Sequence, residues 1–206
     1  MPFDILTFKN SGLVRGGARQ SMFQVTLATG TTGAGSTAAP AFPAGATTKL
    51  PFVCRAASLP GMLVSPIRVP YYGRFIKVAG DRDFDDWTIT IMNDEDFMLR
   101  DTFETWSNWI NTLESNVRQA AYPTENYKAD FTVNQFDKEG EIIRSYNLVG
   151  AWPQRITAID LDWEAQNQIE VFQVVLSYDY WLPNAAGATG GVSTLSYTGI
   201  EGAITG

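Results

Sequence analysis

The sequence predicts a mainly β protein, a two-sheet β-sandwich or partial barrel with one α-helix covering one side or end. Three observations predict this fold class. Apolar and polar residues alternate in one segment after another, 18 Gly and 10 Pro residues supply frequent turns, and aromatic residues make up 13 % of the chain. At 206 residues the chain is long enough to bury a substantial core in one domain.

Alternation predicts seven or eight strands. In residues 21–28 (SMFQVTLA), for example, the apolar side chains fall on one face, as in a half-buried strand. The turn at residues 137–140, which ends in glycine, predicts a hairpin between its two flanking strands. The predicted strands are residues 21–28, 49–56, two arms within 66–79, 85–92, 127–137, 141–150 and 168–181.

The run PIRVPYYGRFIKVA, residues 66–79, predicts a hairpin that turns at Tyr72 and Gly73. Pro66 and Pro70 lack the amide hydrogen that an inner strand needs, so this hairpin is expected at a sheet edge or projecting from the sheet. Exposed tyrosines in such a hairpin are typical interface anchors, and this favours a subunit contact at Tyr71 and Tyr72 over simple turn residues.

One segment has apolar residues at helical spacing and predicts a helix of about five turns. Asn93 and Asp94 are the expected N-cap, and the negative charge that follows them favours the helix dipole. The predicted buried face comprises Leu99, Phe103, Trp106, Ile110 and Leu113. Trp106 and Trp109 could stack on a sugar or a base, but core packing is favoured for Trp106 because it lies on that face.

Composition divides the chain into an N-terminal arm (residues 1–20), one domain (21–181) and a C-terminal extension (182–206). Residues 29–48 are almost entirely Gly, Ala, Thr, Ser and Pro and predict a flexible surface loop. Lys9, Arg15 and Arg19 make the arm basic, which favours contact with an acidic neighbouring subunit over contact with nucleic acid.

The net charge of −7 and the absence of histidine argue against several functions. Tight nucleic-acid binding needs basic stripes, and triad hydrolases and most zinc sites use histidine. Cys54 is the sole cysteine, so no intrachain disulfide can form, and it is expected to be a buried apolar residue. No leader and no apolar run of roughly 20 residues is present, which predicts folding in the cytoplasm.

Two groups of acidic residues are candidates for chemistry. A divalent-metal site at Asp81, Asp83, Asp85 and Asp86 is disfavoured, because the spacing lacks a calcium-loop pattern and Arg82 lies among them. Asp160, Asp162 and Glu164 could be catalytic carboxylates, but alternation would place them on one strand face, and a solvated or interface face is favoured. Neither group is therefore taken as a catalytic or metal site, and we expect no enzyme, no cofactor and no metal.

The run VAGDRDFDDWTITIMNDE, residues 78–95, resembles the tail tube proteins of contractile-tailed bacteriophages. Three further stretches agree with that family: CRAASLPG (54–61), GAWPQRITAIDLDW (150–163) and IEVFQVVLSYDYW (169–181). The loop at 29–48 and the extension after Trp181 depart from it. The motif residues are Gly80, Asp81, Arg82, Phe84, Asp85, Asp86, Trp87, Asn93, Asp94, Trp152, Pro153, Trp163, Tyr178, Tyr180 and Trp181.

The resemblance implies a structural subunit of the virion tail. Six copies would form a ring with a continuous lumenal β-barrel, and stacked rings would form a conduit for the genome inside a contractile sheath, meeting baseplate and tail terminator proteins. Two alternative functions are a tube protein of a bacterial contractile injection or secretion apparatus and a carbohydrate-binding β-sandwich module. The hairpin would bridge successive rings through Pro66, Arg68, Pro70, Tyr71, Tyr72, Arg74, Phe75 and Lys77.

Overall fold

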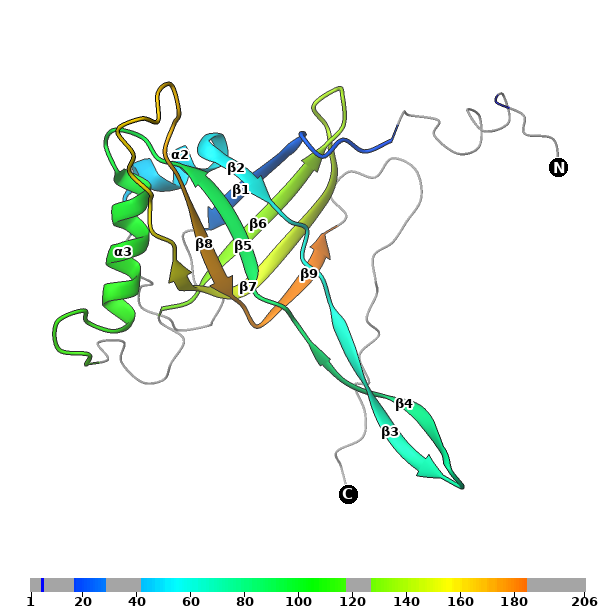
Figure 1. Ribbon diagram of the computed structural model, residues 1–206. Coiled ribbons are helices and arrows are strands. Elements are labelled where there is room, and N and C mark those ends of the chain that lie inside the picture. Colours follow the sequence, from blue (N-terminus) through cyan, green and yellow to red (C-terminus); the bar gives the residue numbers. More distant parts are fainter. Residues whose placement is uncertain (1–4, 6–16, 29–41, 118–126, 185–206) are drawn as a thin grey trace, which may run out of the picture.

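The computed structural model describes residue 5 and residues 17–28, 42–117 and 127–184, and its elements are shown in Figure 1. Nine strands and two helices occur in these ranges. In chain order they are β1 (Phe23–Ala28), α2 (Ala44–Val53), β2 (Cys54–Ala57), β3 (Leu63–Tyr71), β4 (Arg74–Asp83), β5 (Trp87–Met92), α3 (Met98–Ile110), β6 (Ala129–Phe136), β7 (Ile142–Ile156), β8 (Val171–Ser177) and β9 (Tyr180–Asn184).

The body is a seven-stranded antiparallel sheet that shares its longest strand between two halves. The strand order is β1-β6-β7-β8-β5-β2, and β9 pairs with β7 off this path. The first part of β7 pairs with β6 and β9, and its last part, from Trp152, pairs with β8. The predicted mainly β class is therefore confirmed, with the two halves joined through one bent strand.

Gly150 lies at the junction between the two parts of β7. Its φ is +70°, a backbone conformation that glycine adopts at little cost. Its amide donates to the buried Oδ1 of Asp130 at 3.0 Å, and an added Cβ would collide with the carboxylate of Asp179. This glycine therefore allows β7 to leave one half of the sheet and enter the other.

An aromatic core fills the space between the halves and α3. Trp87, Trp106 and Phe131 are at most 2 % exposed, and the ring of Phe131 lies 5.7 Å from that of Trp87 and 6.3 Å from that of Trp106. Each indole N–H keeps an acceptor, Ser58 O for Trp87 and Tyr127 O for Trp106, both at 2.7 Å. The predicted core role of Trp106 is confirmed.

The predicted helix exists, but its limits were wrong. It begins at Met98, after Phe97 in the left-handed region (φ 52°), and ends at Ile110, so that Leu113 lies beyond it and is 83 % exposed. Asn93 is not the N-cap because its backbone and side chain both donate to Glu170, before β8. The remaining predicted face is correct, since Leu99, Phe103 and Trp106 are buried and Ile110 packs against the core.

Residues 49–56 were predicted to be a strand, and most of them are helical. The helix α2 spans Ala44–Val53, and only β2, Cys54–Ala57, is extended. Ala46 and Leu50 are buried one turn apart, which also corrects the flexible loop predicted over residues 42–48. The other residues of that loop, 29–41, lie outside the described residues.

The strand predicted over 168–181 is in fact two. β8 ends at Ser177 and β9 begins at Tyr180, because the chain crosses there from one half of the sheet to the other. At the crossing, the Asp179 amide donates to Val149 O at 3.0 Å and its carboxylate pairs with Lys128 at 2.6 Å. The alternate residues Phe172, Val174, Leu176 and Tyr178 are buried, whereas Tyr180 is 44 % exposed.

Replacing Gly150 with alanine is expected to destabilise the body more than replacing Gly140. Both glycines have positive φ, but the space beside Gly140 is empty, so Gly140→Ala adds only backbone strain of about 1 kcal/mol. Gly150→Ala adds the displacement of Asp179 from Lys128. Urea unfolding of the two variants measures the difference in unfolding free energy, and equal losses would contradict the role assigned to Gly150.

Candidate subunit interface

The most distinctive surface of the molecule is the hairpin formed by β3 and β4. It makes a two-stranded sheet of its own and projects from the body (Figure 1). Its strands have nine and ten residues, which gives a length of about 30 Å. The turn at Tyr72 and Gly73 has φ of 42° and 78°, the signature of a tight two-residue hairpin turn. The predicted hairpin is confirmed, and it is longer than the sequence suggested.

The two faces of the hairpin differ in chemistry. Val69 pairs with Ile76 and Ile67 with Val78, which makes one face apolar except near the turn, where Tyr71 pairs with Arg74. The opposite face carries Pro66, Arg68, Pro70, Phe75 and Lys77 and is called the basic face below. Apart from Gly80, every residue of both strands is exposed. A two-stranded hairpin exposed on both faces is marginal in water and gains from contact with another surface.

Arg68 and Lys77 are directly opposite each other across the basic face. Like charges in such a pair destabilise a hairpin unless an anion lies near them. Within the described residues no carboxylate forms an ion pair with either side chain. Residues 62–80 also contain Arg74 and no Asp or Glu, so this part of the hairpin carries three positive charges, and the acidic residues of its strands, Asp81 and Asp83, lie at the end of β4. The basic face is therefore suited to an acidic partner.

Two tryptophans hold the chain that leads into the hairpin. The indole N–H of Trp87 donates to Ser58 O at 2.7 Å, and that of Trp181 donates to Gly61 O at 2.9 Å. At the base of the hairpin, Gly80 lies so close to Ser65 that an added Cβ would be 2.5 Å from the Ser65 carbonyl oxygen. These contacts couple the direction of the hairpin to the core.

The acidic residues at the end of β4 and just after it serve the connection to the body. Asp83 accepts the Phe84 amide at 2.9 Å, and the Phe84 ring lies 5.9 Å from that of Tyr178. Burial, and then the nearby Asp85 and Asp86, raise the pKa of Tyr178. Over the part of the chain that the structure describes, no group of three or more Cys, Asp or Glu side chains is placed to hold a metal ion.

Most of the other motif residues pack within the body or form ion pairs there, and Trp163 is the exception. Pro153 is buried, and Trp152 packs edge-on against Tyr127 at 6.0 Å. Asp94 forms an ion pair with Lys49. Trp163, in contrast, is fully exposed, on a connection between β7 and β8 that is not a strand, so the alternating face predicted for Asp160, Asp162 and Glu164 was wrong. Sequence reasoning did not single out the exposed Leu161 and Ile169 on the same connection.

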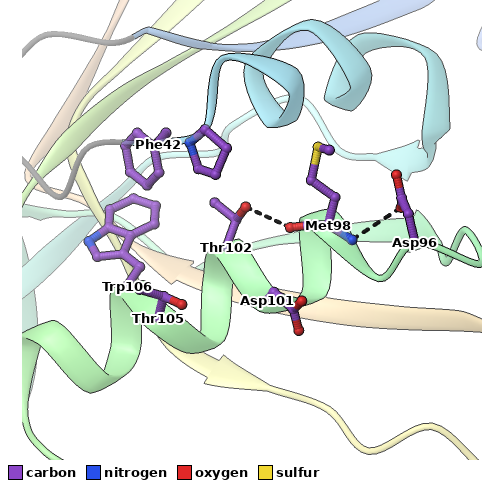
Figure 2. Close-up of a pocket in the computed structure, with 8 residues that line it drawn as sticks. Phe42, Asp96, Met98, Asp101, Thr102, Thr105 and Trp106 are labelled. Carbon is purple, nitrogen blue, oxygen red and sulfur yellow. Dashed lines mark hydrogen bonds between the residues drawn. The ribbon is translucent and has the colours of Figure 1, made fainter.

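A pocket of about 370 Å³ lies between α2 and α3 (Figure 2). Phe42 meets Trp106 edge-on at 4.8 Å, the Thr102 hydroxyl donates to Met98 O at 2.6 Å, and the Met98 amide donates to Asp96 at 3.1 Å. The hydrogen bond from Lys49 holds the pKa of Asp96 below its usual value. Asp96 is already paired with Lys49, and the Thr102 hydroxyl is bonded within α3, so these two groups serve the packing and geometry of the helices.

The edges of the sheet are a second incomplete feature. β1 and β2 are the ends of the strand path, and β9 pairs only with β7 among the described strands. Such edges present unpaired backbone groups that favour association with other chains. An open sheet together with a projecting hairpin that exposes apolar and basic side chains is typical of one class of protein, the subunit that associates with other chains.

Comparison with known proteins identifies the family. Residues 18–184 match the family model described as phage tail tube protein, and the chain belongs to this family. It is 38 % identical over 131 residues to tail tube protein gp19 of Enterobacteria phage T4, and the aligned residues cover 63 % of this chain and 79 % of the relative. The resemblance inferred from residues 78–95 is confirmed, and the chain is a structural subunit of a phage tail tube.

Solved structures share the fold. The tube-terminating cap of the anti-feeding prophage aligns with a TM-score of 0.55 and 20 % identity, covering 82 % of this chain and 92 % of that one. The sheath-tube complex of the PVC extracellular contractile injection system in its extended state aligns with a TM-score of 0.50 and 17 % identity, covering 89 % and 99 %. None of the helices in the described ranges has the length and apolar character needed to cross a membrane.

Cys54 is expected to react slowly in the folded protein. It is half-buried, and burial raises the pKa of its thiol to about 12, so almost no thiolate is present at pH 8. Alkylation by iodoacetamide at pH 8 should be about a thousandfold slower than in guanidinium chloride, where the thiol pKa returns to about 8.5. Equal rates in the two conditions would show that the thiol is accessible and ionised in the fold.

Proposed function

We propose that six copies of this chain form a ring and that the rings stack into a hollow tube. The open edges supply the lateral contacts, in which strands of adjacent copies pair into one barrel around the lumen. The hairpin supplies the axial contacts, because it extends beyond the body and cannot bury its apolar face there. The single observation that carries this proposal is that the hairpin is exposed along both of its faces.

The tube carries the phage genome inside a contractile sheath. The structural neighbours support this role, since one comes from a sheath-tube complex, one from a tube-terminating cap and one, with a TM-score of 0.56, from the anti-feeding prophage baseplate. Sheath, baseplate and terminator proteins are accordingly the proposed partners. The role requires no catalysis. The N-terminal arm at residues 1–20 and the C-terminal extension at 182–206 remain proposals, and the first residues of that extension belong to β9.

Acidic residues in the hairpin should prevent stacking without unfolding the body. Each buried Val or Ile contributes about 1.5–3 kcal/mol, so Val69→Glu with Ile76→Glu should raise the concentration needed for tubes about a hundredfold or more. Negative-stain electron microscopy over a concentration series measures this effect. The thermal unfolding of the body should stay unchanged, because the hairpin forms its own sheet.

Leu113→Glu is the matched control for this pair of changes. Leu113 is 83 % exposed and lies beyond α3, on a different part of the body from the hairpin, so this variant should form tubes at the wild-type concentration. Tubes from the hairpin variant at that same concentration would refute the axial role of the hairpin.

Assembled tubes should not retain DNA. The net charge of −7 per chain provides no basic lining of the kind that releases counterions from phosphates. A duplex fragment mixed with purified tubes at about 0.15 M salt should migrate freely in a gel-shift assay. Retention that weakens steeply with added salt would mean that the lumen binds the genome.

A further inference from the structure

The connection between β7 and β8, residues 157–170, carries charged side chains and exposed apolar side chains, as the hairpin does. Its charge is negative, whereas that of the hairpin is positive. It contains Asp160, Asp162, Glu164 and Glu170 and no Lys or Arg. Its apolar side chains are also exposed, Leu161 by 78 %, Trp163 fully and Ile169 by 68 %. This segment is called the acidic loop below.

The acidic loop and the hairpin lie at opposite ends of the body (Figure 1). The hairpin leaves the end where β5 begins, whereas the acidic loop leads into β8 at the end where β5 finishes, close to Asn93. A projection at one end and a complementary surface at the other allow head-to-tail contact between identical chains, which continues from copy to copy.

Two carboxylates of the acidic loop have no cation. Within the described residues, neither Asp160 nor Glu164 forms an ion pair or accepts a hydrogen bond through its side chain. Among the other acidic groups at this end, Asp94 and Asp96 pair with Lys49 and Asp137 accepts the amides of its own turn, whereas Glu139 and Glu141 of that turn are exposed. The acidic loop is thus the part of this end that offers both free carboxylates and apolar side chains.

We propose that the acidic loop of one subunit receives the basic face of the hairpin of another copy, an inference that rests on the stacked tube proposed above. Arg68 and Lys77 meet Asp160 and Glu164, which removes the like-charge repulsion across the hairpin. Phe75 and the adjacent prolines pack on Trp163, an aromatic anchor of the kind enriched at the centre of interfaces. The apolar face of the hairpin stays available for other contacts in the tube.

Charge exchange tests this pairing. Asp160→Lys with Glu164→Lys should raise the concentration needed for stacking about tenfold or more, and so should Arg68→Glu with Lys77→Glu. Combining all four changes in one chain restores opposite charges and should return stacking to near the wild-type concentration. Tubes are counted by electron microscopy, and circular dichroism confirms that each variant is folded.

The control reverses two other charges at the same end of the body. Glu139→Lys with Glu141→Lys alters exposed residues of the β6–β7 turn and should leave stacking unchanged. Equal disruption by this control, normal stacking of the acidic-loop variant, or failure of the fourfold variant to recover would each overturn the inference. If the acidic-loop variant stacks normally but no longer binds sheath protein, the loop is a sheath contact and the inference is wrong.

The experiment separates this inference from the proposed function. If wild-type protein forms tubes and the hairpin variant Val69→Glu, Ile76→Glu does not, the proposed function stands whatever the acidic loop does. If wild-type protein forms no tubes at any concentration, the proposed function fails and the inference fails with it.

Discussion

The structure depends on one constraint: the β3–β4 hairpin has no core. Its backbone groups pair only within two strands, its apolar side chains face solvent on one side, and two cations face each other on the other side. Each of these features raises the free energy of an isolated subunit relative to an assembled one. The exposed hairpin therefore favours association of the subunit with other chains.

The body is organised to hold this unstable element in a fixed direction. Trp87 belongs to the aromatic core, yet its indole N–H reaches the chain before the hairpin at Ser58. Trp181 does the same from β9 at Gly61. The motif between the hairpin and β5 then returns the chain to the core through Phe84. Many of the residues that carry the family resemblance thus position the hairpin, while its own side chains make the proposed contacts.

The strand shared by the two halves of the sheet explains why the body tolerates open edges. β7 pairs with β6 and β9 before the bend at Gly150 and with β8 after it, so neither half can separate without breaking the same strand. The halves enclose the Trp87, Trp106 and Phe131 cluster, which keeps the interior stable while β1, β2 and β9 remain available at the edges. A folded core and incomplete edges coexist because they use different strands.

The sequence by itself determined the mainly β class, both hairpins, the buried face of α3 and the family, because alternation, tight turns and a long motif are local signals. It missed α2, which was predicted as loop and strand, and it misplaced the limits of α3 and the division between β8 and β9. Those features depend on distant partners: Ala46 and Leu50 are buried against the core, Asn93 is bound to Glu170, and Asp179 bonds to Val149 and Lys128. For Asp160, Asp162 and Glu164 the sequence indicated a solvated or interface face, but the full exposure of Trp163 and the position of the acidic loop at the end opposite the hairpin were decided only by the tertiary structure.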